Sequence, residues 1–261
     1  MSPIEGYYDE LAPYYKFLHR DWEASVARQA EALDGVIGEF FGPSARRVLD
    51  AACGIGTQCL GLAQRGYHVA ASDISSAEIA VARAEAERRG LAIDFGLGDM
   101  RQLSQARPGP FDVVLACDNA IPHLLTEADI LRAFQEFHRC TTPEGGCLIS
   151  VRDYASLEER AGQAATQFYP RTVHATPEGR VVIFDLWEFE GDYYDFTTYI
   201  VEDQPAAPAA VHVIRGGRYY CVTLAALERL LRQAGFGRVV TLTDRFFQPL
   251  LVALKRREPQ S

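Results

Sequence analysis

Apolar and polar residues follow two different rhythms along the chain. From about residue 22 to residue 153, short apolar runs alternate with segments whose apolar positions recur every three or four residues. Short apolar runs are typical of buried strands, and the longer period is typical of amphipathic helices. The alternation predicts a parallel sheet that is covered by helices on both faces, with ligands bound at the carboxyl ends of the strands.

The elements expected from this rhythm fall into two groups. We expect strands at 46–50, 67–73, 91–100 (ending in a loop), 111–117, 146–151, about 238–243 and within 246–256. We expect helices at 22–41, from the glycine-rich turn to about 65, at 76–89, about 127–140 and 224–234. Gly90 is a suitable C-terminal stop for the helix at 76–89.

The second rhythm occupies residues 169–223. This segment is rich in Val, Ile, Phe, Tyr and Thr and is broken by "PEG", "EGD", "DQPAAP" and "RGG". Alternating β-branched and aromatic residues between turn residues predict an antiparallel meander. The helix and strands that follow return to the first rhythm, so the meander is an insert placed to roof the carboxyl ends of the parallel strands.

The fold class predicted is therefore α/β, a doubly wound and mostly parallel sheet with an antiparallel β insert. A length of 261 residues suits one large domain. We divide residues 1–261 into an N-terminal helical lid of about 1–42, a core of about 43–155 and 223–257, and the insert of about 166–222.

Charge and composition narrow the possible partners. The net charge of −9 argues against nucleic acid, which is bound by clustered Lys and Arg. The N-terminus has no signal-peptide pattern, and no apolar run reaches the roughly 20 residues of a membrane span. The six cysteines form no C-x-x-C pair, and no zinc ligand set is evident, so we expect reduced thiols, no metal and a cytoplasmic protein.

The stretch "VLDAACGIGTQ" at 48–58 predicts a strand that turns sharply into a helix, where a backbone can approach a ligand closely. A dinucleotide fingerprint needs a third glycine, but Cys59 stands there, after Gly54 and Gly56. Asp50 closes the strand, and a carboxylate there would repel pyrophosphate and favour a cationic ligand. S-adenosylmethionine carries both a sulfonium and an ammonium group.

Three further residues suit that ligand. Asp73, at the end of the second strand, can accept hydrogen bonds from both ribose hydroxyls. Asp99 in "GDM" can accept one from the adenine amine, while Met100 packs on the ring. Each aspartate alone could be a helix cap or a turn residue, and dehydrogenases also use an acid at the position of Asp73.

The motifs "VLDAACGIGTQ", "ASDIS", "GDM" and "FDVVLACDNAIPHL" resemble those of class I S-adenosylmethionine-dependent methyltransferases. The resemblance covers nearly the whole chain. It implies a seven-stranded Rossmann-like sheet with the last strand antiparallel, and S-adenosylmethionine as cofactor with S-adenosylhomocysteine as product. Within the motifs, Ala52, Ile74 and Cys117 are expected beside the cofactor. N-terminal segments like "YYDELAPYY" fold over the cofactor in this family, which implies a contact from Tyr15 or Tyr8.

Several segments resemble those of glycine and sarcosine N-methyltransferases. "CDNAIPHL" implies that Asn119 and His123 face the substrate, and "SVRDY" implies that Arg152 binds its carboxylate. "RYYCVTLAALERLL" implies that Tyr220 or Tyr219 is the tyrosine that reaches the site, and the resemblance implies that Arg28 binds the cofactor's carboxylate. The departures are Asp118 in place of a small residue and an insert that matches loosely.

We therefore expect a methyltransferase that N-methylates an amine or amino acid bearing an anionic group. His123, the sole histidine in these motifs, could take the proton of the nucleophile. One alternative is methyl transfer to oxygen or carbon of a small, possibly aromatic, metabolite, which the aromatic insert would suit. Another is a nicotinamide-dependent oxidoreductase, against which the missing third glycine counts. The oligomeric state is left open.

Overall fold

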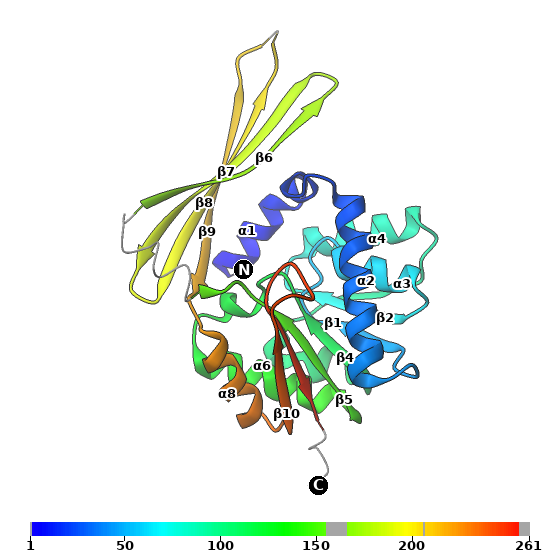
Figure 1. Cartoon of the computed structure of the whole chain (residues 1–261). Coiled ribbons are helices and arrows are strands. Elements are labelled where there is room, and N and C mark those ends of the chain that lie inside the picture. Colours follow the sequence, from blue (N-terminus) through cyan, green and yellow to red (C-terminus); the bar gives the residue numbers. More distant parts are fainter. Residues whose placement is uncertain (1, 155–165, 206, 256–261) are drawn as a thin grey trace.

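The parallel strands form a seven-stranded sheet at the centre of the molecule (Figure 1). The computed structural model describes residues 2–154, 166–205 and 207–255. The strand order is β10-β11-β5-β4-β1-β2-β3, and all neighbours pair in parallel except β11, which is antiparallel to both β5 and β10. The strands of this sheet are β1 Arg47–Asp50, β2 His68–Asp73, β3 Asp94–Leu97, β4 Phe111–Ala116, β5 Thr141–Ser150, β10 Arg238–Leu242 and β11 Leu250–Leu254.

Helices cover both faces of this sheet. The longer ones are α2 Trp22–Phe41, α3 Thr57–Gln64, α4 Ser76–Arg88, α6 Glu127–Cys140 and α8 Leu224–Gln233, and the short ones are η2 Met100–Gln102, α5 Leu103–Ala106 and η3 Ile121–Leu124. The helices α2, α3 and α4 share one apolar core with the sheet, and α6 and α8 share a second core on its other face. Because both faces are covered, β4 and β11 are apolar along nearly their whole length.

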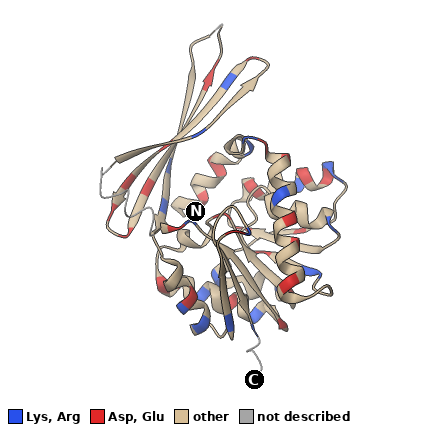
Figure 2. Cartoon of the chain, in the orientation of Figure 1, with Lys and Arg blue, Asp and Glu red and all other residues tan. Residues whose placement is uncertain are grey.

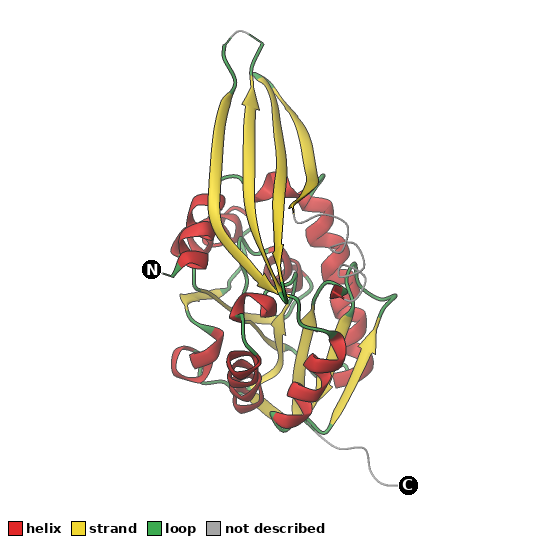
Figure 3. Ribbon diagram, turned by 90° about the vertical axis from the view of Figure 1, so that its left-hand side faces the viewer, coloured by secondary structure: helices red, strands yellow, loops and turns green. Residues whose placement is uncertain are grey.

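The insert is a separate four-stranded antiparallel sheet of order β6-β7-β8-β9. Its strands are β6 Thr166–Thr176, β7 Gly179–Glu190, β8 Tyr193–Asp203 and β9 Ala210–Tyr220. Figure 3 shows these long strands rising away from the α/β core. From Tyr193 to Ile200, residues of β8 alternate between partly exposed and buried positions, which is the pattern of a sheet covered on one face.

The N-terminal segment covers that buried face. Helix α1 (Pro3–Leu11) lies between the four-stranded sheet and the core, and η1 (Tyr15–Leu18) follows it (Figure 1). Ser2 and Glu5 form a capping box at the start of α1. Tyr7 and Leu11 pack with Trp187 and Tyr194 in a third apolar core. The N-terminus therefore joins the insert to the rest of the molecule.

The α/β class, the antiparallel last strand and the antiparallel insert are confirmed. Element bounds differ by a few residues. The four-stranded sheet covers 166–220, a few residues before the expected 169–223, and β5 begins at Thr141. Gly90 takes a φ of 65°, as a helix-stopping glycine does. The division of the chain into lid, core and insert stays a prediction.

Charged residues are spread over the surface of the core. Figure 2 shows Lys and Arg interspersed with Asp and Glu along the helices. Among the described residues, no helix has the length and apolarity needed to cross a bilayer.

Candidate active site

The glycine-rich turn connects β1 to α3 at the carboxyl edge of the sheet. Gly54 and Gly56 have φ values of 51° and 99°, a region that L side chains rarely adopt. A Cβ on Gly56 would also stand 2.8 Å from Cδ1 of Leu60. Gly56 therefore shapes the turn, and it opens α3 as its N-cap residue.

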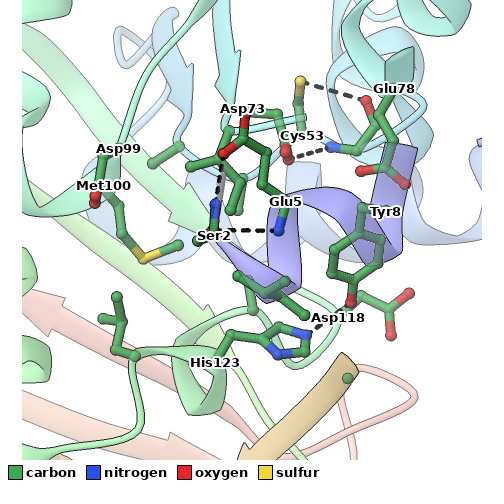
Figure 4. Close-up of a pocket in the computed structure, with 18 of the residues that line it drawn as sticks. Ser2, Glu5, Tyr8, Cys53, Asp73, Glu78, Asp99, Met100, Asp118 and His123 are labelled. Atoms are coloured by element: carbon green, nitrogen blue, oxygen red, sulfur yellow. Dashed lines mark hydrogen bonds between the residues drawn. The ribbon is translucent and has the colours of Figure 1, made fainter. Parts of the chain in front are cut away.

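A cavity of about 970 Å³ lies above this turn, and we call it the first cavity (Figure 4). The ends of β1, β2, β3 and β4 form its floor, while α1 and residues of β8 and β9 close it from the other side. The expected site residues in its wall are Tyr15, Ala52, Gly54, Asp73, Ile74, Asp99, Met100, Cys117 and His123. Asp50, the last residue of β1, and Gly56, the N-cap of α3, are not among the residues that line the cavity.

The two aspartates expected to bind the adenosine moiety are in the first cavity. Asp73 accepts hydrogen bonds from the backbone N–H groups of Gly54 and Ser75, both at 2.9 Å. Burial raises the pKa of Asp73, and these N–H groups oppose the rise. The Asp99 carboxylate pairs with Arg101 at 2.6 Å. Burial alone would raise the pKa of Asp99, but Arg101 outweighs it, so the net pKa is lowered.

Two other carboxyl groups at this site are buried without a partner. Neither carboxyl oxygen of Asp50 forms a hydrogen bond with a described residue, and the same is true of Oε1 of Glu78. Burial raises the pKa of Asp50 to about 7, and Asp73 adds to the rise. The backbone N–H groups of Ala52 and Cys59 partly offset this rise in pKa, although neither forms a hydrogen bond with the Asp50 carboxyl group. Unpaired buried carboxyl groups fit a cationic ligand.

A second cavity of about 840 Å³ adjoins the first. Tyr8, Tyr15, Asp118 and Phe196 line both cavities, so they form a shared wall. The second cavity is rich in aromatic and cationic side chains. Its other lining residues include Tyr7, His19, Arg28, Arg152, Tyr169, Arg171, Trp187 and Tyr219.

Arg152 has no carboxylate partner among the described residues. Its Nη1 donates to the hydroxyl of Tyr194 at 2.6 Å. The guanidinium lies over the rings of Trp187 and Tyr219, 5.4 and 5.2 Å from the ring centroids. Arg171 differs, because its guanidinium pairs with the buried carboxylate of Asp185 at 2.6 Å. Arg152 is therefore suited to bind an anionic ligand.

His123 uses both ring nitrogens within the protein. Its Nδ1 lies 3.0 Å from the carbonyl oxygen of Arg218, and its Nε2 lies 2.7 Å from the hydroxyl of Tyr8. A carbonyl can only accept, so Nδ1 carries the proton, and the neutral ring accepts the Tyr8 proton at Nε2. Burial, helped by Arg152, lowers the pKa of His123 to about 3. The ring is therefore neutral, and both nitrogens are engaged within the protein. The expectation that His123 takes the proton of the nucleophile stays a prediction.

Two of the expected substrate residues reach neither cavity. Asn119 is completely buried, and its side chain is bonded to the Tyr154 hydroxyl at 2.7 Å and the Arg152 amide at 3.0 Å. It supports the backbone of Arg152. Tyr220 is wrong as the tyrosine of the site, because side chains alternate along β9 and put Tyr219 on the cavity face. Tyr220 packs against Tyr193 on the other face.

Sequence reasoning overlooked Glu78, Arg171 and the pairing of Tyr8 with His123. Glu78 looks like an ordinary acid in the first turn of a helix. Arg171 lies in the insert, where the face of the sheet on which a side chain lies depends on the pairing of the strands, and the sequence does not reveal that pairing. The alternation of apolar and polar residues at the end of β7 could have indicated that Trp187 lies on the covered face of the sheet, where it lines the second cavity. Among the described residues, no group of three or more His, Cys, Asp or Glu side chains could hold a metal ion.

Known proteins resemble this chain over most of its length. Residues 48–145 match the family described as "Methyltransferase domain". A glycine/sarcosine N-methyltransferase of Halorhodospira halochloris is 27% identical over 86% of this chain and 76% of its own length. A ubiquinone biosynthesis O-methyltransferase of Pseudomonas aeruginosa is 32% identical, over 54% of this chain and 62% of its own length. The solved structure of Streptomyces venezuelae DesVI shares the fold, with a TM-score of 0.76 at 19% identity, covering 94% of this chain and 96% of that one.

The fold and the site define a Rossmann-like enzyme with a ligand cavity at the carboxyl ends of its parallel strands. Together with the sequence matches, they identify the chain as a class I S-adenosylmethionine-dependent methyltransferase that acts on a small molecule. Its cofactor is S-adenosylmethionine. The first cavity fits this cation, since two buried carboxyl groups beside it have no cationic partner.

Proposed function

We propose that this methyltransferase transfers the methyl group to the nitrogen of a small amine or amino acid that carries an anionic group. The observation that carries the proposal is the guanidinium of Arg152, which lines the second cavity without a carboxylate partner among the described residues. A bound carboxylate would accept the two parallel hydrogen bonds that a guanidinium offers. Similarity to a glycine/sarcosine N-methyltransferase over most of the chain supports nitrogen as the acceptor.

The cofactor is assigned to the first cavity. Asp73 would bind the ribose hydroxyls, Asp99 and Met100 the adenine, and Ile74, Cys117 and the turn residues Ala52 and Gly54 would line its path. Tyr15 belongs to the wall shared by both cavities, and Arg28 lines the second cavity, where it would bind the carboxylate of the methionine moiety. Asp50 and Gly56 act through the shape and charge of the turn. When bound, S-adenosylmethionine supplies an electrophilic methyl group.

Tyr8 would orient the nucleophile at the shared wall. Its hydroxyl proton is donated to Nε2 of His123, so the oxygen presents only lone pairs to the cavities. An amine N–H can donate to that oxygen, which turns the nitrogen lone pair toward the methyl group. His123 is then a positioning residue, which holds Tyr8 as an acceptor.

Methyl transfer to oxygen remains the alternative, because an O-methyltransferase is also similar over half of the chain. The aromatic wall of the second cavity would also accept a phenol. Arg152 separates the two functions, since a neutral phenol does not need it.

Arg152→Ala tests the proposal. Methyl transfer would be followed with a panel of amino acids, amines and phenols, and cofactor binding by titration with S-adenosylhomocysteine. We expect unchanged nucleoside binding and a loss of about 2–5 kcal/mol in kcat/KM for anionic amines, because their charge is left unpaired. The control is Arg180→Ala, an exposed arginine paired with Asp203 in the four-stranded sheet. Equal turnover of neutral phenols with and without Arg152 would favour the O- or C-methyl alternative.

A further inference from the structure

We propose that Glu78 is the receptor for the sulfonium charge of S-adenosylmethionine. Its carboxyl group is charged beside S-adenosylmethionine and neutral beside S-adenosylhomocysteine, so a proton leaves and returns with each catalytic cycle. The inference rests on the proposed cofactor site in the first cavity, and it assigns to that site a residue outside the sequence motifs.

Glu78 lies in the first turn of α4 and lines the first cavity. Its exposed fraction is only 2%, and Oε1 has no hydrogen-bond partner among the described residues. Oε2 stands 3.4 Å from the position of a Cβ on Gly54, so the carboxyl group touches the cofactor turn. An acid in a first helical turn usually interacts with the helix dipole from the solvent. Burial without a partner is unusual and points to a ligand.

The groups that face Glu78 are acids and tyrosines. Asp73 stands at the end of β2, and Asp9 of α1 accepts a hydrogen bond from Ser75 at 2.6 Å. Asp50 lies behind the same turn, next to Asp73. The rings of Tyr8 and Tyr15 close the opposite side, and Figure 4 shows Tyr8 between Glu78 and His123.

No lysine or arginine in the described part of the chain forms an ion pair with Glu78. Burial, together with the charges of Asp73 and Asp9, therefore raises the pKa of Glu78 well above its ordinary value. Without a ligand, the carboxyl group is held in its neutral form over an unusually wide pH range. At a given pH, a cation brought into the cavity would shift the carboxyl group toward its charged form.

The two nucleosides differ in the charge they bring. Both carry the ammonium and carboxylate of the amino acid moiety, but only S-adenosylmethionine carries a sulfonium. A cation held near Glu78 in a water-poor cavity favours the carboxylate, so the carboxyl group loses a proton when S-adenosylmethionine binds. S-adenosylhomocysteine has no sulfonium and leaves the group protonated.

The charge balance continues through the reaction. As the methyl group moves, the sulfur keeps the electron pair of the broken bond and becomes neutral. The nucleophile forms its new bond with its own lone pair, becomes positive, and then loses a proton to solvent water. When the sulfonium charge disappears, Glu78 takes up one proton from solvent. The pair of Glu78 and sulfur is thus neutral both before and after transfer, and no uncompensated carboxylate remains buried beside the product.

Isothermal titration calorimetry of the free enzyme tests this directly. Each nucleoside is titrated in buffers of different ionisation enthalpy over a series of pH values on both sides of neutral, because the pKa of Glu78 is raised. We expect S-adenosylmethionine to release on the order of half a proton to one proton more than S-adenosylhomocysteine. Its affinity should rise with pH by up to about tenfold per unit until Glu78 is ionised in the free enzyme, while that of S-adenosylhomocysteine changes less.

Glu78→Gln should abolish the difference in proton release and weaken S-adenosylmethionine more than S-adenosylhomocysteine. The matched control is Glu87→Gln, an exposed residue of the same helix, which should behave as the wild type. If the Gln variant does not fold, the comparison of the two nucleosides on the wild type still decides the question.

Three results would overturn the inference. The first is equal proton release by the two nucleosides on the wild type. The second is a difference that persists in Glu78→Gln, which would move the titration to Asp50 or Asp73. Failure of both nucleosides to bind the wild type would overturn the cofactor site itself, and with it this inference.

Discussion

The two cavities differ in the sign of the charge that each leaves unpaired. At the first cavity, the carboxyl groups of Asp50 and Glu78 are buried without a cationic partner. In the second, Arg152 contacts aromatic rings and a hydroxyl but forms no ion pair with a described carboxylate. Unpaired charges in a protein interior are costly, so each cavity favours a ligand of the opposite sign. One cavity suits a cation and the other suits an anion.

On the proposed function, this opposition would orient a two-substrate reaction. The cationic methyl donor would be held on one side, and the anionic group of the acceptor on the other. The reacting atoms would then meet at the shared wall, which includes Tyr8 and Asp118. Positioning of this kind is a large part of what an enzyme contributes to a displacement reaction.

Asp73→Ala should have the largest effect and should be confined to the first cavity. We expect affinity for both nucleosides to fall by about 3 kcal/mol or more, since two ribose hydroxyls lose a charged acceptor worth about 1.5–3 kcal/mol per bond. The measurement is calorimetric titration. Both nucleosides should weaken equally, unlike in Glu78→Gln.

The control for Asp73→Ala is Asp34→Ala, whose carboxylate pairs with Arg65 away from both cavities. Circular dichroism should show that the variant is folded, because Asp73 also accepts from the amides of Gly54 and Ser75. Unchanged nucleoside affinity would remove Asp73 from the ribose site.

Asp50→Asn should have a smaller effect than Asp73→Ala, and its main effect should be on the stability of the fold. The folded-state pKa of Asp50 is about 7 against an ordinary value of 3.8. Its contribution to stability is therefore fully present below pH 3.8 and is lost as the pH rises through 7. Above that range the wild type buries a charge that the variant lacks. We expect the variant to be more stable at about pH 8, by on the order of 1–3 kcal/mol, in chemical denaturation.

The same variant should also bind S-adenosylmethionine more weakly, because a carboxylate near the cation is lost. Its stability advantage should shrink as the pH falls toward the ordinary range of an aspartate. A variant that is no more stable than the wild type at alkaline pH would contradict this prediction. It would show that the charged Asp50 carboxylate does not lack stabilising partners, although its buried oxygens have no hydrogen bond with a described residue.

The first cavity was more predictable from sequence than the second. Its expected residues lie in strand–turn–helix units, where one short segment determines both the strand end and the side chain on it. Asp73, Asp99 and Met100 could be placed because the carboxyl ends of parallel strands share one edge of a sheet. Glu78 was missed because a glutamate in the first turn of a helix is usually exposed, and the local sequence does not distinguish a buried one.

The second cavity depends on contacts between segments that are distant in sequence. Tyr219 and Tyr220 are neighbours, and which of them faces the cavity is set by the pairing of β9 with β8. Asn119 was expected at the substrate, but its positive φ of 69° and its bonds to Tyr154 and Arg152 turn it into the protein. Such choices are made by tertiary structure, because a shift of one residue reverses the face of a strand.

Tyr8→Phe should have the smallest effect and tests the wall that both cavities share. If the Tyr8 oxygen orients the nucleophile, its removal should lower kcat about three- to tenfold, the value of one hydrogen bond, with little change in KM. His123→Asn should lower kcat similarly, and the double variant should lose little more, since both act through one oxygen. Tyr14→Phe is the control, because its hydroxyl pairs with Glu202 outside both cavities.

The pH profile of kcat separates this positioning role of His123 from base catalysis. A histidine with a pKa of about 3 leaves kcat flat near neutral pH. A step near pH 6.5, the ordinary histidine value, that disappears in His123→Asn would restore His123 as the base.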